Sequence, residues 1–189
     1  MPYMISYSDK PLPLETLPAW KITHFRGEPS RGPVYAYLRC YVHGGALAYS
    51  ATVFDEAPPA TARFGFAFTT LEKPQRYLFL VCAKQLETTL HLYEAAPPDD
   101  APVQALPLPP SRHLGGSDEQ GFYWSAEGEI PSELLQSVFG HVPQVGDVLP
   151  GNVFLYDEAE AAFGSACPVP EGRHVPTAEG FGALIVTPY

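Results

Sequence analysis

Residues 34–55 read VYAYLRCYVHGGALAYSATVFD, two runs of strand-forming residues on either side of the pair Gly44-Gly45. In the first run, aliphatic residues and a cysteine alternate with tyrosines and an arginine. That alternation is typical of a strand with one face on a core. Two glycines supply the positive φ angles that a two-residue turn requires. The stretch therefore predicts a β-hairpin.

Further strand patterns follow the hairpin. Residues 62–69 (ARFGFAFT) alternate strictly and place three phenylalanines on one face. Residues 76–83 (RYLFLVCA) are almost continuously apolar, which is typical of a strand buried on both faces. Further strands are expected at 19–25, 88–94, 121–130, 152–156 and 183–187. Residues 1–17 are expected to be extended. Residues 95–110 are expected to form a loop or an edge excursion, and residues 112–121 another loop.

A single segment, residues 131–139, predicts a helix. Pro131 suits the first turn, leucines and a valine form an apolar stripe, and Gly140 ends the segment. Proline, which breaks helix interiors, accounts for 22 of the 189 residues. We therefore expect one all-β domain over residues 1–189. Its predicted architecture is a two-sheet antiparallel β-sandwich of immunoglobulin-like or jelly-roll type with one short helix.

The charge balance excludes two classes of partner. Eleven Lys and Arg against 21 Asp and Glu give a formal net charge of −10. Such a chain repels the phosphates of nucleic acids and the surface of anionic membranes. Apolar runs are far shorter than the ~20 residues of a spanning helix. The N-terminus, MPYMISYSDK, shows no secretory leader, so the expected location is the cytoplasm, or outside the cell if a leader has been removed.

A series of short motifs follows in order through the last third of the chain. They are Glu129-Ile130-Pro131, Leu134-Leu135, Gly146-Asp147, residues 152–156 (NVFLY), Arg173-His174-Val175-Pro176 and residues 181–185 (FGALI). The ordered set resembles the end of family 9 carbohydrate-binding modules and their family 9-like relatives. The resemblance implies a sandwich that holds a saccharide in an aromatic slot and has no catalytic role.

The chain departs from the family pattern in two places. Cys167 precedes Pro168 where family members often carry a tryptophan, and residues 75–80 lack the family's acidic cluster. No cofactor is expected from the residues themselves. Calcium is known in the family, and by resemblance alone Asp118-Glu119 and Asp157-Glu158-Glu160 are the acidic residues that would supply oxygen ligands.

A saccharide site needs flat rings for the sugar C–H groups and polar side chains for the hydroxyls. The ring candidates are Trp20 and Trp124, the two tryptophans of the chain, and Tyr123. Tyr123 and Trp124 are neighbours, so one of them faces outward on a regular strand. For both tryptophans, packing in the core is the competing interpretation. The tyrosines at 35, 37 and 41 form a second aromatic row, for which packing between layers competes.

The polar candidates lie in or near the closing motifs: Asn152, Arg173 and His174. For His174 a structural hydrogen bond competes with ligand contact, and for Arg173 a solvated charge. Enzyme motifs are absent, and a solvated strand face explains the pair Glu127 and Glu129. Two hypotheses remain: a non-catalytic saccharide-binding module, or a structural or protein-interaction sandwich that has lost the sugar site.

Overall fold

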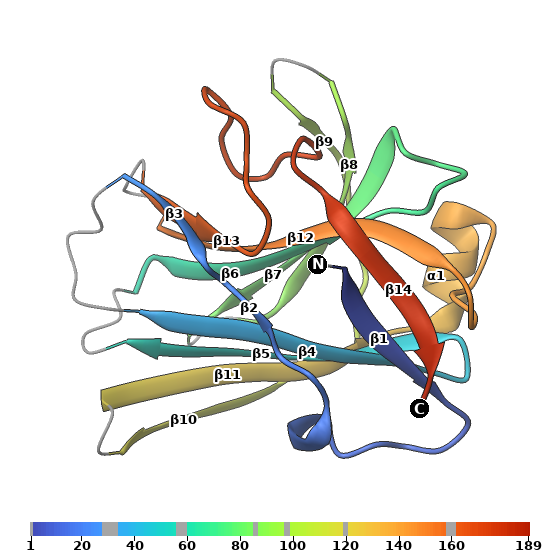
Figure 1. Ribbon diagram of the computed structural model, residues 1–189, viewed down its shortest axis with the longest axis horizontal. Helices are drawn as coiled ribbons and strands as arrows, with labels where there is room; N and C mark the ends of the chain where they lie inside the picture. Colours follow the sequence, from blue (N-terminus) through green and yellow to red (C-terminus); the bar gives the residue numbers. More distant parts are fainter. Residues whose placement is uncertain are drawn as a thin grey trace.

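The computed structural model describes residues 2–27, 34–55, 60–84, 87–96, 99–118, 121–157 and 162–189 (Figure 1). Within these ranges the chain forms strands, a 3-10 turn η1 (Leu14–Thr16) and one α-helix, α1 (Ser132–Phe139). The strands are β1 (Tyr3–Ser8), β2 (Trp20–Lys21), β3 (His24–Arg26), β4 (Tyr35–His43), β5 (Ala46–Asp55), β6 (Ala62–Phe68), β7 (Arg76–Ala83), β8 (Thr89–Glu94), β9 (Ala101–Leu106), β10 (Arg112–Asp118), β11 (Gly121–Ile130), β12 (Val148–Asp157), β13 (Phe163–Ser165) and β14 (Gly182–Pro188). The all-β prediction is confirmed.

The hairpin predicted from residues 34–55 is present as β4 and β5. The two strands pair antiparallel from Tyr35 opposite Phe54 to His43 opposite Ala46. Gly44 and Gly45 make the turn with φ angles of 55° and 82°, which residues with a Cβ rarely adopt. β11 then pairs along the other edge of β5, so β5 is a central strand.

The strands form one continuous mixed sheet, which corrects the expected pair of antiparallel sheets. Its order is β10-β11-β5-β4-β1-β14-β12-β6-β7-β8-β9. β1 runs parallel to both of its neighbours, β14 and β4. One half of the sheet consists of β4, β5, β11 and β10, and the other of β12 and β6 to β9. β1 and β14 join the two halves, and Figure 1 shows them crossing between these halves. Prolines at 2 and 11 flank β1. Because of these prolines, the sequence predicted only an extended segment here and not a paired strand.

The main core lies between the two halves of the curled sheet. Inward-facing side chains of β4, β5 and β11 meet those of β6, β7 and β12 in one buried cluster. Phe64, Phe66 and Phe68 are all buried there, as their alternation predicted. Cys40 and Cys82 also lie in this cluster as free thiols, and burial raises the pKa of each to about 12. Both thiols are therefore neutral packing groups at pH 7.

Two segments that were not expected to be regular strands form edge strands. Residues 101–106 are the exposed edge strand β9, in agreement with the expected edge excursion. Residues 112–118 form β10 along β11, so the loop prediction for 112–121 was wrong. Gly116 explains why a glycine-rich strand pairs here, because a Cβ at this position would lie 2.9 Å from the Tyr123 hydroxyl.

The predicted helix is confirmed with a small shift of its start. α1 begins at Ser132, and Pro131 is its extended N-cap residue. Gly140 ends it with a φ of 73°, the left-handed conformation that glycine adopts without steric cost. This helix is too short to cross a bilayer, and the described ranges contain no helix that is long and apolar enough to do so.

Candidate functional site

The structure buries both tryptophans in the main core. Trp20 is 9% exposed and stacks on Tyr3 at a ring-centroid distance of 5.2 Å. Trp124 is 1% exposed. They occupy inward positions of their strands, opposite Leu38 and Val53 respectively. Their burial favours core packing for both indoles, and Trp124 also borders a hollow of about 620 Å³ beside β10 and β11.

Asn152 is an internal scaffold residue, which corrects its assignment to the ligand site. Its side chain is fully buried. The amide nitrogen Nδ2 donates to the carbonyls of Cys167 (3.0 Å) and Gly180 (3.3 Å), and Oδ1 accepts from the backbone N–H groups of Val153 and Cys167, both at 2.9 Å. With both amide atoms used by backbone, Asn152 fixes the two ends of residues 166–181.

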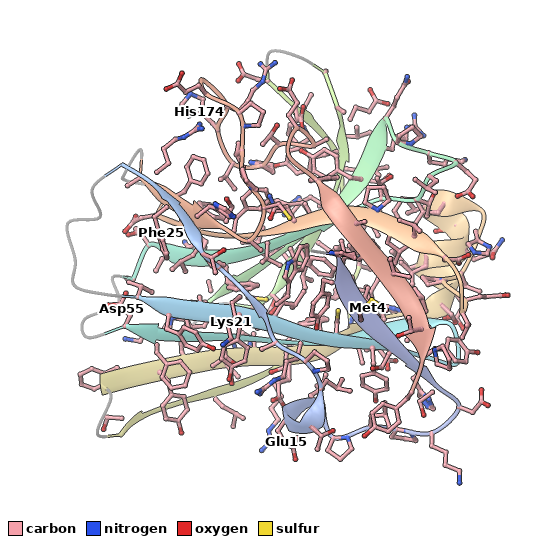
Figure 2. The ribbon with its side chains drawn as sticks, in the orientation of Figure 1. Met4, Glu15, Lys21, Phe25, Asp55 and His174 are labelled. Carbon is pink, nitrogen blue, oxygen red and sulfur yellow. The ribbon has the colours of Figure 1, made fainter. Side chains whose placement is uncertain are left out.

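Residues 166–181, here called the closing segment, connect β13 to β14 and carry two further candidates. Arg173 pairs with Glu179 inside the segment, and that hydrogen bond raises the pKa of the guanidinium. His174 is exposed near the outer end of the segment (Figure 2). Tyr123, half-buried on β11, belongs to the other half of the sheet. The predicted site residues are therefore not brought together in one place.

Side chains outside the closing segment hold it against the sheet. The Asp100 carboxylate accepts a hydrogen bond from the Tyr77 hydroxyl at 2.8 Å and another from the Ala178 backbone N–H at 2.6 Å. Burial, followed by the Asp100 contact, raises the pKa of the Tyr77 phenol. On the other side, Arg26 of β3 donates to the carbonyls of Pro170 and Val169. These hydrogen bonds fix the closing segment in place, so it can form one wall of the surface next to it.

A pocket of about 640 Å³ opens between this wall and the outer face of β6, β7, β8 and β12. We call it the β6–β8 pocket. Phe79, Tyr93 and Tyr156 supply aromatic rings to its lining, and Val175 and Pro176 of the closing segment border it. Its polar lining consists of Arg63, Glu87, Thr89 and His91.

The strand register places these residues on one face. Tyr156 of β12 lies opposite Arg63 of β6, and Phe79 of β7 lies opposite His91 of β8. Because side chains alternate along each strand, the phenylalanines of β6 point into the core while Arg63 points to the opposite face. The pocket is therefore built on rigid, paired strands, and one wall comes from the closing segment.

The ring arrangement in the pocket depends on Gly65. Phe79 and Tyr156 lie nearly parallel with ring centroids 6.3 Å apart, and Tyr93 meets Phe79 edge-on at 5.8 Å. A Cβ at Gly65 would lie 2.5 Å from Phe79 Cε2 and 3.4 Å from Tyr156 Cε1. The missing side chain thus leaves the space that the two rings occupy.

Replacing this glycine tests the arrangement. We expect Gly65→Ala to push the Phe79 ring from its place and to destabilise the fold by about 1 to 3 kcal/mol, the usual range for overpacking. Urea denaturation of the two proteins measures the change. The matched control is Gly115→Ala, where the added Cβ meets only the Tyr123 carbonyl oxygen at an ordinary 3.5 Å, and stability should change by less than about 0.5 kcal/mol. Equal stability of Gly65→Ala and the parent would contradict the crowding.

The calcium ligands suggested by the resemblance do not assemble in the described part of the chain. Glu119, Glu158 and Glu160 lie outside the described residues, as does the side chain of Asp118. Asp157 is buried at the end of β12. Among the described residues, no group of three or more histidine, cysteine or carboxylate side chains is placed to hold a metal ion. Calcium binding therefore stays an expectation that rests on the resemblance alone.

Comparison with solved structures identifies the architecture. A family 9 carbohydrate-binding module from Caldicellulosiruptor kristjanssonii, solved with cellotriose, aligns at a TM-score of 0.66 and 10% identity over 100% of this chain and 95% of that chain. This chain has the fold of a family 9 carbohydrate-binding module. A family 9 module from the same organism, solved with glucose, aligns at a TM-score of 0.63 and 9% identity over 100% of this chain and 97% of that chain. A candidate carbohydrate-binding protein from Bacteroides uniformis aligns at a TM-score of 0.69 and 14% identity over 97% of both chains.

The resemblance read from the sequence is confirmed for this family 9-like fold. No protein-family model and no curated protein sequence matches the chain. The pocket residues Arg63, His91, Tyr93 and Tyr156 were not among those predicted. Their signal was the alternation itself: each occupies an outward position on a strand whose inward positions are apolar.

Proposed function

We propose that the protein is a non-catalytic module that holds a saccharide in the β6–β8 pocket. The observation that carries the proposal is the grouping of three aromatic rings with a cation, a carboxylate and a histidine in one cavity. Sugar C–H groups pack on aromatic faces, while hydroxyls bond to charged and polar side chains. Its volume lies within the usual range of ligand pockets, roughly 300 to 1,000 Å³.

Each side chain has a part in this proposal. Tyr156 and Tyr93 offer half-buried rings to a pyranose, and the buried Phe79 ring packs beneath both. Arg63 donates to the carbonyls of Ala60 and Ala62, which holds its guanidinium at the pocket edge. Glu87, which also lines the pocket, would accept hydrogen bonds from sugar hydroxyls. The cellotriose and glucose held by the two similar modules support a neutral sugar as the ligand here.

The test is a calorimetric titration with glucose, cellotriose, xylotriose and mannotriose. We expect Tyr156→Ala to weaken binding of the preferred sugar at least tenfold, which is about 1.4 kcal/mol. The matched control is Tyr189→Ala, which removes a ring that is 70% exposed at the chain end and should leave the affinity unchanged. An equal loss in both variants, or none in Tyr156→Ala, would refute the pocket assignment.

A second candidate function is a structural or protein-interaction module that has lost sugar binding. Two observations favour it: both tryptophans are buried, and Cys167 stands where the family often carries a tryptophan. The same titration separates the candidates, because this one predicts no heat with any of the four sugars. Tryptophan fluorescence is a poor reporter for the choice, since both indoles are remote from solvent.

A further inference from the structure

A second aromatic and polar surface lies on the other half of the sheet, on the outer face of β4, β5 and β11. The strand register places Tyr35, Phe54 and Tyr123 in one row across these strands. The next row holds Tyr37, Thr52 and Ser125, and the one after it Arg39, Ser50 and Glu127. None of these residues belongs to the β6–β8 pocket.

The rings of this face form a continuous group. Phe54 lies 5.8 Å from Tyr123, 6.0 Å from Tyr35 and 6.4 Å from Tyr37, measured between ring centroids. Tyr35 is 42% exposed, and the other three rings are half-buried. Gly116 of β10 leaves room for the Tyr123 ring, because a Cβ there would lie within 3.1 Å of it. The face therefore presents fixed rings to solvent.

Beside the rings is a hollow of about 450 Å³ with a floor of hydroxyl groups. Ser50, Thr52 and Ser125 make the floor, and Tyr37, Phe54 and Tyr123 line one side. We call this the hydroxyl groove. Short side chains on the floor are what keep the hollow open, since longer ones at these central positions would fill it.

Charged groups occupy the other side of the groove. The Arg39 guanidinium lies over the Tyr37 ring at 4.7 Å and donates to the Tyr37 hydroxyl at 3.4 Å. Glu127 accepts from the Ser50 hydroxyl at 3.3 Å. Glu15 of η1, labelled in Figure 2, adds a second carboxylate at the rim. The Lys21 ammonium lies 5.5 Å from the centroid of the Tyr35 ring, so two cations balance two carboxylates and the described part of this face has no net charge that would favour an ionic ligand.

The N-terminal segment covers only the neighbouring part of this face. Tyr41 is buried with Leu17 and Ala48 under Leu12 and Leu14. For Tyr41, the interpretation that the tyrosine row packs between layers is therefore correct. It does not apply to Tyr35 and Tyr37. The cover ends at Glu15, so the polar and aromatic rows beyond it remain open among the described residues.

We propose that the hydroxyl groove is a second saccharide-binding site, which takes a neutral, linear oligosaccharide lying across β4, β5 and β11. The rings would stack on successive sugar units, and the floor hydroxyls with Arg39 and Glu127 would bond to sugar hydroxyls. A floor of short hydroxyls offers no apolar socket for the aromatic or arginine anchors that dominate protein interfaces, which argues for a sugar. The row crosses three strands, about 10 Å, so it suits a chain better than one sugar.

The test separates the two sites by nuclear magnetic resonance. Cellohexaose, xylohexaose and mannohexaose are each titrated into ¹⁵N-labelled Tyr156→Ala protein, which lacks a pocket ring. We expect at least one hexasaccharide to shift the amides of Thr52, Phe54 and Ser125, and Tyr123→Ala to weaken that binding at least tenfold. Tyr189→Ala should change it less than twofold. If Tyr123→Ala fails to fold, Tyr123→Leu replaces it.

Two results would overturn the second site. One is the absence of shifts at the groove amides with all three hexasaccharides. The other is unchanged affinity in a folded Tyr123 variant. Failure of the β6–β8 pocket has a different signature, namely groove shifts in the parent protein without any shift at His91, Tyr93 or Tyr156.

Discussion

Asn152→Ala is expected to lower the free energy of unfolding by about 3 to 5 kcal/mol and to loosen the closing segment. The substitution leaves the Cys167 N–H and the Gly180 carbonyl without their side-chain partner. Each buried backbone group that loses its hydrogen bond costs about 1 to 3 kcal/mol. A cavity at a fully buried position adds to the loss. Such a sum is a large share of a domain's usual stability of 5 to 15 kcal/mol.

Urea denaturation measures the stability, and hydrogen exchange of residues 166–181 measures the loosening. Asn152→Asp is the isosteric comparison: its carboxylate would face the Cys167 and Gly180 carbonyls, so we expect at least as large a loss at pH 7. Gln104→Ala, which removes an exposed amide on β9, should change stability by less than about 0.5 kcal/mol. A stable Asn152→Ala protein with a protected closing segment would show that Asp100 and Arg26 suffice to hold it.

The parts of the fold that the sequence predicted are those with strong local signals. Strict alternation and the Gly44-Gly45 pair specify β4 and β5, and Pro131 with Gly140 brackets α1. The missed element β10 pairs with β11, and its Gly116 leaves room there for the Tyr123 ring. This is a contact between neighbouring strands, which no local pattern displays. The parallel pairing of β1 is likewise a long-range choice, and it turns the expected two sheets into one.

The candidate site was harder to predict for a related reason. Trp20 and Trp124 were chosen because a saccharide site needs flat aromatic rings, yet large apolar rings are equally suited to a core. Which use applies depends on the direction of the side chain, and both lie opposite inward residues of a paired strand. Tyr93 and Tyr156 point outward instead, but only the closing segment, placed by Asn152 and Asp100, makes a pocket of that face.

Trp124 gives the second large expected effect, in which two substitutions at one position change stability to very different extents. Trp124→Ala should lower the free energy of unfolding by about 3 to 5 kcal/mol, because it empties a fully buried site in the main core. Trp124→Phe should change it by less than about 1.5 kcal/mol. The indole Nε1 is buried without a hydrogen-bond partner in the described part of the chain, and an unsatisfied donor costs about 1 to 3 kcal/mol. Removing this unsatisfied N–H group therefore offsets part of the stability that the smaller phenylalanine ring loses in packing.

The same pair of variants decides what Trp124 does for the ligand. If the residue were part of a sugar slot, Trp124→Phe would stay folded and lose affinity. Because its ring lies in the core of the other half of the sheet from the β6–β8 pocket, we expect Trp124→Phe to bind sugar within twofold of the parent, measured by the same calorimetric titration. A tenfold loss in this folded variant would show that Trp124 takes part in sugar binding. Retained affinity with reduced stability in Trp124→Ala would separate packing from recognition at this position.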